Sequence, residues 1–148
     1  MNRVNVCDLF TGHDHITGQH IYYQDEEGTK PYNGVIFEYF EGLLSSESEV
    51  KDGYITGIEK IYYSYTGELK AIYEMNFNTI NGIAKEFYKN GKIKNHSVVI
   101  NNLHIYAISY DEEGNTTEIF EMQPDDTDDN RIKELIPIYR EKYKLVAH

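Results

Sequence analysis

The chain has 148 residues, of which 40% are hydrophobic and 14% aromatic, so it is long enough to bury a core and too apolar for a disordered protein. Lys and Arg number 14 against 25 Asp and Glu, which gives a net charge of -11. This charge argues against nucleic acid or an anionic membrane as a direct partner, because both select positive surfaces. It favours a basic partner.

The sequence has no feature that predicts membrane insertion or secretion. No run approaches the ~20 apolar residues of a membrane span, and the first residues lack the continuous apolar core of a signal peptide. Cys7 is the single cysteine and has no partner for an internal disulfide. We expect it to pack as a small apolar residue in a short strand over residues 4–10. A cytoplasmic location is predicted.

The polar segment 11–18 contains the closest approach to a metal-binding motif. Its His13, Asp14 and His15 invite a metal hypothesis, because residues two apart on a strand point the same way. A closed site needs three or four ligands, and His20 is the only further histidine nearby. We therefore predict a solvated turn here, with no metal and no cofactor.

Residues 32–122 contain an internal repeat, which consists of a glycine, four residues and two adjacent aromatics. It begins at Gly34, Gly57 and Gly82, and a second glycine follows each aromatic pair. A fixed period in the low twenties is typical of a repeat architecture. The last copy has His104 in place of the leading glycine and Ser109 in place of the first aromatic, a decay that suits a terminal repeat.

Each copy reads as a β-hairpin. In the clearest copy we expect strands over residues 58–63 and 68–77, a glycine turn between them, and a second turn over residues 78–82. After Gly42 we expect a longer loop, residues 42–49. Residues 17–31 look like a degenerate first copy. Stacked hairpins share one apolar surface, so the fold predicted is mainly β, an open antiparallel sheet of successive hairpins.

The C-terminal segment differs from the repeats. An acidic, proline-led linker over residues 123–130 precedes a helical pattern over residues 131–144. Aspartates before the helix can cap its first amides, and Pro137 predicts a kink or a late start. We divide the chain into a repeat domain, residues 1–123, and a segment 124–148 whose helix covers an exposed end of the sheet. The alternative is a helix that binds a partner.

The repeat resembles a known family. Residues 81–94, NGIAKEFYKNGKIK, closely resemble the bacterial MORN-repeat variant of the YwqK-type antitoxin family. The resemblance covers residues 32–122, with a weak extension back to Gly18. It implies an open sheet of hairpins and a role as an antitoxin or immunity protein encoded beside a toxin. It brings no catalytic residues with it.

The sequence offers little chemistry for an enzyme. It contains no nucleotide-binding glycine loop, zinc-ligand spacing or serine elbow. Paired acids such as Asp111 and Glu112 fall in predicted turns, where a general acid and base would lack a sheltered pocket. We therefore predict a protein that is not an enzyme.

The leading hypothesis is an antitoxin that binds a cognate toxin, such as a basic, nuclease-like domain, and covers its active surface. Tyrosines supply contact area and acids complement a basic cleft. The alternative is a non-catalytic repeat scaffold for protein or membrane-associated assembly. The binding residues predicted for the toxin are Glu38, Tyr39, Glu59, Tyr62, Tyr63, Glu86, Tyr88, Asp111, Glu112 and Glu113.

Overall fold

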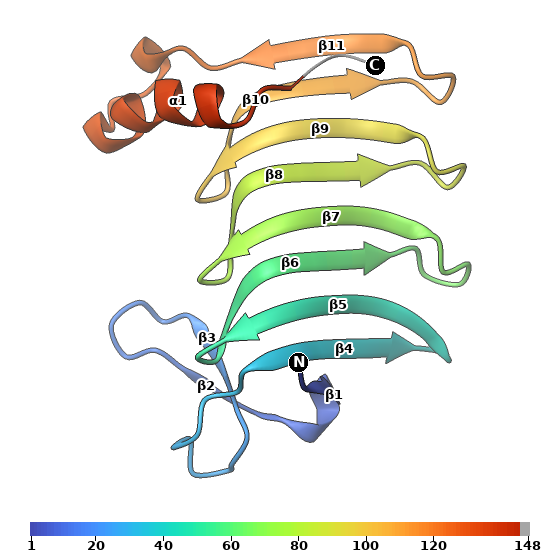
Figure 1. The fold of residues 1–148 in the computed structure, drawn as a ribbon, viewed down its shortest axis with the longest axis vertical. Coiled ribbons are helices and arrows are strands. Elements are labelled where there is room, and N and C mark those ends of the chain that lie inside the picture. The colour runs from blue at the N-terminus through green and yellow to red at the C-terminus, as the bar shows by residue number, and fades with distance from the viewer. Residues whose placement is uncertain (146–148) are drawn as a thin grey trace.

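The computed structural model describes residues 1–145 and contains an open nine-stranded sheet (Figure 1). Its strands follow the order β1-β4-β5-β6-β7-β8-β9-β10-β11. They are β1 (Arg3–Asn5), β4 (Gly34–Phe40), β5 (Leu43–Lys51), β6 (Tyr54–Tyr62), β7 (Leu69–Asn76), β8 (Thr79–Phe87), β9 (Ile93–Ile100), β10 (Leu103–Tyr110) and β11 (Thr116–Glu121). From β4 to β11 the strands form successive antiparallel hairpins, and β1 runs parallel to β4. The predicted sheet of hairpins is confirmed, with β1 as a parallel addition.

The N-terminal segment forms a separate two-stranded sheet of β2 (Phe10–His13) and β3 (His20–Tyr23). The predicted first copy, residues 17–31, therefore adds no hairpin to the main sheet. It keeps the glycine turn, in which the Gly28 N–H donates to the Asp25 carbonyl at 3.2 Å. Beyond that turn an isolated bridge pairs Tyr23 with Pro31, and hydrogen bonds from Gln24 to Lys30 and from Tyr32 to Tyr22 hold it.

The N-terminus itself differs from the strand predicted over residues 4–10. A 3₁₀ helix, η1 (Val6–Asp8), interrupts it between β1 and β2. The Asn5 side chain accepts a hydrogen bond from the Cys7 N–H and so favours this turn over an extended chain. Cys7 is exposed, so the prediction that it packs as a small apolar residue is wrong.

Two of the three leading glycines, Gly57 and Gly82, lie inside strands and shape a recurrent bulge. Gly57 and Gly82 have φ values of 114° and 125°, which side chains rarely adopt. At each bulge the next N–H turns away from the ladder and donates to a glutamate across the strand pair. Ile58 N–H donates to Glu49, and Ile83 N–H donates to Glu74 at 2.7 Å. Each carboxylate thus satisfies the amide that its bulge leaves without a backbone partner.

The fourth copy has a shorter bulge. In cross-strand register Val98 pairs with Ile83, as Glu49 pairs with Val35 and Glu74 with Ile58. His104 pairs directly with Val99, and the bulge shrinks to the single residue Ile105. Val98 is fully buried. The decay of the repeat therefore replaces a carboxylate by an apolar contact.

Two predicted turns are wrong. The chain turns at Phe77 and Asn78, with φ values of 46° and 65°, and not over residues 78–82. Residues 42–49 form no long loop, because a two-residue turn at Glu41 and Gly42 leads directly into β5. The serines and glutamates of β5 looked like a loop. They are tolerated in a strand because Ser48 and Val50 are buried while Glu49 between them points to the other face.

Asparagines join neighbouring hairpins at the tight-turn end of the sheet. The Asn78 side chain accepts from the Ile55 N–H at 2.7 Å, and the Asn102 side chain accepts from the Ile80 N–H at 2.8 Å. The backbone N–H of each asparagine donates back to the same isoleucine. This reciprocal pair repeats from one hairpin to the next and sets how they stack.

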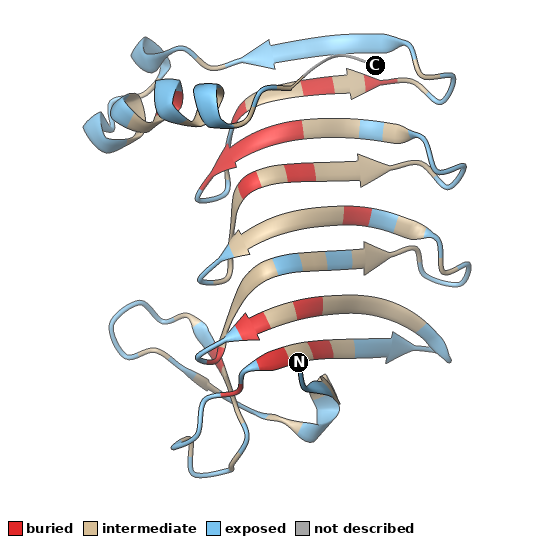
Figure 2. Cartoon of the chain, in the orientation of Figure 1, coloured by how far each residue is buried: buried red, intermediate tan, exposed pale blue. Residues whose placement is uncertain are grey.

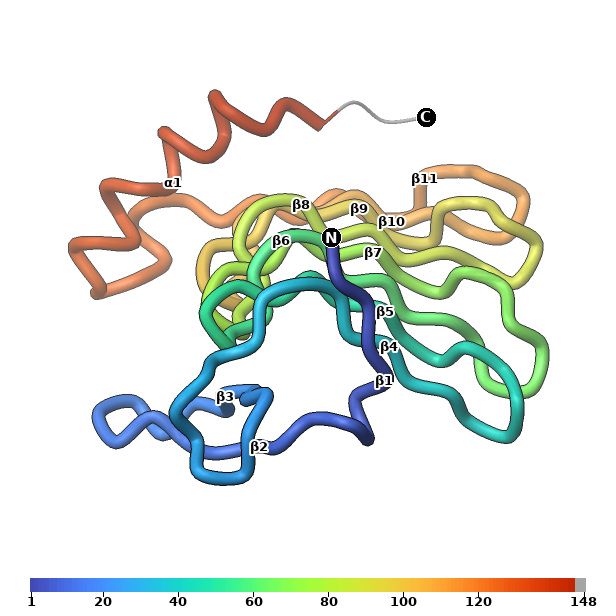
Figure 3. Tube along the Cα trace, turned by 60° about the horizontal axis from the view of Figure 1, so that its bottom comes forward, coloured from blue at the N-terminus to red at the C-terminus, as the bar shows by residue number. Residues whose placement is uncertain are grey.

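The sheet buries apolar residues on opposite faces at its two ends. Near β9 and β10, Val98, Ile100 and Ile105 pack against Ile136 of the C-terminal helix. Near β4 and β5, Ile36 and Val50 pack against the N-terminal segment on the other face. Figure 2 shows these two groups of buried residues, and Figure 3 shows the helix and the N-terminal strands on opposite sides of the sheet. We call the side that contains Val98 the helix face.

The C-terminal helix, α1 (Asn130–Lys142), begins directly after its N-cap residue, Asp129. The Asp129 side chain accepts from the N–H groups of Arg131 and Ile132, which confirms capping by an aspartate. A 3₁₀ turn, η2 (Pro124–Asp126), precedes it. Pro137 lies inside the helix, so of the two predicted alternatives, a kink or a late start, the late start is excluded. The helix packs on a face of the sheet and leaves the β11 edge uncovered.

We predict that Gly82→Ala destabilises the protein by about 2–4 kcal/mol, because Ala strains at this φ and its Cβ would meet the Glu74 carboxylate. Gly91→Ala is the matched control, since its φ is 86° with no heavy atom near the added Cβ, and we expect a loss of about 1–2 kcal/mol. Urea unfolding measures both. Equal losses would show that the Glu74 contact contributes nothing.

Candidate functional site

The face opposite the helix carries two continuous cross-strand rows of residues. One row is Ile36, Ser48, Glu59, Tyr73, Ala84, Ser97, Ala107 and Phe120, and the other is Glu38, Ser46, Ile61, Ala71, Glu86, Asn95, Ser109 and Glu118. The rows hold Glu38, Glu59, Glu86 and Glu118, and no position of either described row is a Lys or Arg. We call this side the acidic face.

Neighbouring hydroxyl groups orient two of these glutamates. Ser48 Oγ donates to Glu59 Oε2 at 2.7 Å, and the Tyr73 hydroxyl donates to Glu86 Oε1 at 3.4 Å. Ser48 is buried, while Glu59 and Glu86 are half-buried. Their carboxylates are therefore held in place by the sheet and still reach solvent.

The N-terminal segment covers the acidic face only over β4 to β6. Val6 and Tyr22 of this segment line a cavity of about 170 Å³ together with Ile36, Ile55 and Glu59 of the main sheet. Burial raises the pKa of the Tyr22 hydroxyl, and the negative charges of Glu59 and Glu38 raise it further. From β7 to β11 neither described core cluster covers this face.

Tyr39 and Tyr62 lie on the helix face, away from the acidic rows. The Tyr62 hydroxyl donates to Glu47 Oε1 at 3.2 Å, and Glu47 also pairs with Arg3. The hydrogen bond from Arg3 lowers the pKa of Glu47. Tyr39 is 52% exposed. The structure therefore separates these two predicted residues from Glu38, Glu59 and Glu86.

The sheet has a long-loop end, where residues 63–68, 88–92 and 111–115 connect its strands. Tyr63 and Tyr88 join consecutive hairpins at this end. The Tyr63 hydroxyl donates to the Phe87 carbonyl at 2.6 Å, and the Tyr88 hydroxyl donates to the Tyr110 carbonyl at 2.7 Å. Both rings are half-buried. These contacts give both tyrosines a structural role that the exposed placement predicted from sequence did not include.

Lysines surround the same tyrosines. The Nζ atoms of Lys70 and Lys89 lie 5.7 and 5.5 Å from the centre of the Tyr63 ring, and Lys94 lies 5.8 Å from that of Tyr88. The long-loop margin of the sheet is therefore partly basic, in contrast to the acidic rows.

The predicted acids Asp111, Glu112 and Glu113 lie in the loop between β10 and β11. The Asp111 carboxylate accepts from the N–H groups of Glu113 and Asn115, and the bond from Asn115 leads in lowering its pKa. Asp111 thus shapes the loop, whereas Glu112 and Glu113 are exposed. The two exposed acids lead into the edge strand.

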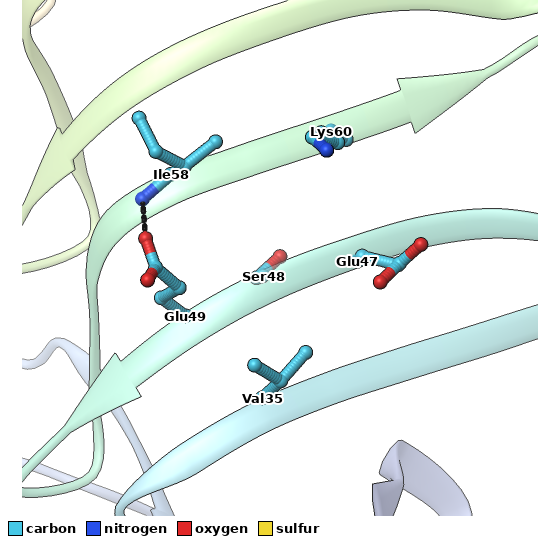
Figure 4. Close-up of a pocket in the computed structure, with 6 residues that line it drawn as sticks. All are labelled: Val35, Glu47, Ser48, Glu49, Ile58 and Lys60. Carbon is cyan, nitrogen blue, oxygen red and sulfur yellow. Dashed lines mark hydrogen bonds between the residues drawn. The ribbon is translucent and has the colours of Figure 1, made fainter. Parts of the chain in front are cut away.

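A shallow cavity of about 340 Å³ lies on the helix face beside β5 and β6 (Figure 4). Its lining includes Val35, Glu49, Ile58 and Lys60. The Glu49 carboxylate is committed to the Ile58 N–H, and the figure shows this bond inside the cavity. The cavity therefore presents mixed charge, and its central acid serves the fold.

The histidines considered for a metal occupy different elements. His13 ends β2 and packs edge to face on His20 with ring centres 4.8 Å apart, while His15 lies in the exposed turn beyond β2. Asp14 accepts from the Tyr54 hydroxyl at 2.6 Å. The metal hypothesis required His13 and His15 to lie on the same face of one strand, and they do not. In residues 1–145 no three His, Cys, Asp or Glu side chains gather as ligands.

Sequence reasoning missed Tyr22, Tyr73 and Glu118. Tyr73 alternates with Ala71 in a predicted strand, and that spacing places it on the face of Glu59. Glu118 joins the rows only through the pairing of β10 with β11. Tyr22 reaches the face because a separate sheet folds back on β4 to β6. Only the position of Tyr73 carried a signal in the sequence.

The comparisons with known proteins give no relative. Neither a protein-family model, nor a curated protein, nor a solved structure matches this chain. In its described part the chain has no helix of the length and apolarity that crossing a bilayer requires.

We predict that Tyr63→Phe and Tyr88→Phe each lower the free energy of unfolding by about 0.5–1.5 kcal/mol, because each removes one bond between hairpins. Tyr65→Phe is the control, since Tyr65 is 70% exposed, and should change stability by less than about 0.5 kcal/mol. Urea unfolding distinguishes them. Losses no larger than that of Tyr65→Phe would deny the two hydroxyls a structural role.

A pH-dependent contribution is expected from Asp14. The Tyr54 hydroxyl leads in lowering its pKa below 3.8, followed by the N–H groups of Thr17 and Ile16. A carboxyl with a lowered pKa stabilises the fold above its ordinary pKa, and this contribution is lost as the pH falls through the lowered value. The stability difference between the wild type and Tyr54→Phe should therefore be larger at pH 7 than at pH 2.

NMR titration of the Asp14 carboxyl and urea unfolding at both pH values check this expectation. The pKa of Asp14 should rise in Tyr54→Phe and stay unchanged in Tyr65→Phe. A stability difference that is the same at pH 7 and pH 2 would contradict a role for the ionised carboxylate.

Proposed function

We propose that the chain is a non-catalytic antitoxin or immunity protein, which binds a positively charged toxin protein and covers its active surface. The observation that carries the proposal is the acidic face, where Glu38, Glu59, Glu86 and Glu118 lie in rows without an intervening cation. Complementary charge speeds encounter and excludes partners of like charge. The resemblance of residues 81–94 to the antitoxin repeat supports the same role.

The shape of the sheet adds support. Strands lie about 4.8 Å apart, so the open part of the acidic face from β7 to β11 is roughly 20 Å wide. Tyr73 and Phe120 stand at its two sides, with the small side chains of Ala84, Ser97 and Ala107 between them. An exposed aromatic ring at the side of this area suits contact with another protein. Phe120 is 42% exposed and available for it.

The first experiment identifies the partner. The protein is co-expressed with the product of the adjacent gene and recovered by pull-down, while growth of the host reports neutralisation. We expect a complex and restored growth. A neighbouring product that is not toxic, or that does not bind at micromolar concentration, contradicts the proposal.

The second experiment tests the surface. We predict that the combined change of Glu38, Glu59 and Glu86 to Gln weakens toxin binding at least tenfold, because it removes the charges but preserves side-chain shape and one acceptor oxygen in each residue. The matched control changes Glu26, Glu27 and Glu134, which are exposed elsewhere, and alters net charge equally. The difference between the two variants should shrink as salt is added. If both variants weaken toxin binding equally, binding depends on the net charge of the protein and not on the acidic face.

A further inference from the structure

The edge of the sheet at β11 is open. All six residues of β11 are exposed, including Ile119 at 56% and Phe120 at 42%. The strand at the opposite edge, β1, has only three residues and pairs with part of β4. The helix α1 packs on a face, against Val98 and Ile105, and leaves the β11 edge free of a described partner strand. β11 is therefore the place where the ladder can continue.

The backbone of β11 has groups that point outward. The Met122 N–H donates to the Ile105 carbonyl, so these two residues form a hydrogen-bonded pair. Bonded and non-bonded pairs alternate in antiparallel strands. Phe120 and Glu118 consequently bond toward β10, while the N–H and C=O groups of Ile119 and Glu121 point away from it. An added strand would find these groups ready to pair.

Charge determines what kind of strand fits. β11 contains neither Lys nor Pro, the residues that commonly protect an edge. Glu112 and Glu113 precede it. Within residues 1–145 no ion pair engages Glu118, whereas Glu121 pairs with Arg140 of α1. A second copy of this chain would bring another net charge of -11 to the same edge. A basic strand meets complementary charge instead.

We infer that β11 accepts an extended, positively charged segment of a partner protein, which pairs with Ile119 and Glu121 as a further antiparallel strand. Main-chain bonds supply affinity in this mode, and alternate side chains select the sequence. The positive charge of the partner is the one part of this inference that rests on the proposed function. The inference uses the edge of the sheet, a surface separate from Glu38, Glu59 and Glu86.

The test needs no toxin. The probe is a blocked octapeptide of alternating lysine and valine, whose affinity for the full chain is measured by calorimetry. Ile119→Pro removes an outward N–H without breaking a bond to β10, because proline is tolerated at that position of an edge strand. Ile119→Val keeps the N–H and serves as the control. A second probe is N-methylated along one edge, which keeps its charge and removes its pairing groups.

We expect the octapeptide to bind the wild type and Ile119→Val, and to slow hydrogen exchange at the Ile119 and Glu121 amides. Ile119→Pro and the N-methylated probe should each weaken binding at least tenfold. The N-methylated probe decides the question even where Ile119→Pro does not fold.

Three outcomes overturn the inference. The octapeptide fails to bind, or both probes bind equally and attraction is electrostatic only. The third is a dimer in sedimentation that Ile119→Pro abolishes, because a second copy then occupies the edge. None of them bears on Glu38, Glu59 and Glu86, which the Gln variants test independently.

Discussion

The carboxylate that caps each bulge is the interaction on which the sheet depends. Without Glu49 and Glu74, the amides of Ile58 and Ile83 would lie in a half-buried sheet without a partner, at a cost comparable to a lost hydrogen bond. The positive φ of the glycine shapes the bulge. The glutamate offsets the cost of the bulge by accepting a hydrogen bond from the amide that has left the ladder. Gly and Glu therefore act as one unit, and both disappear together in the fourth copy.

That loss has a consequence for the architecture. Val98 stands where a glutamate would have stood, and it provides the fully buried contact on which Ile136 of α1 packs. The N-terminal segment packs instead at Ile36 and Val50, on the other face. Because each end is covered on a different side, the acidic face stays open from β7 to β11. A repeat sheet with identical copies would offer no such asymmetry.

The tyrosines show how structure divides a set of similar residues. Tyr63 and Tyr88 use their hydroxyls to hold hairpins together, and Tyr62 bonds to Glu47 on the helix face. The glutamates follow a different logic, since Glu59 and Glu86 meet on one side through strand register. The face that carries the proposed function is therefore defined mainly by its glutamates, and aromatic residues contribute less to it.

The sequence by itself determined the hairpins and the capping of the C-terminal helix by an aspartate, because turn residues and helix caps act locally. It misplaced the turn at Phe77 and Asn78, since a bulge glycine looks like a turn glycine. Only the tertiary structure decided that Glu118 joins Glu86, and that α1 and Tyr22 cover opposite faces. Those outcomes depend on packing between segments far apart in the chain, which no local pattern encodes.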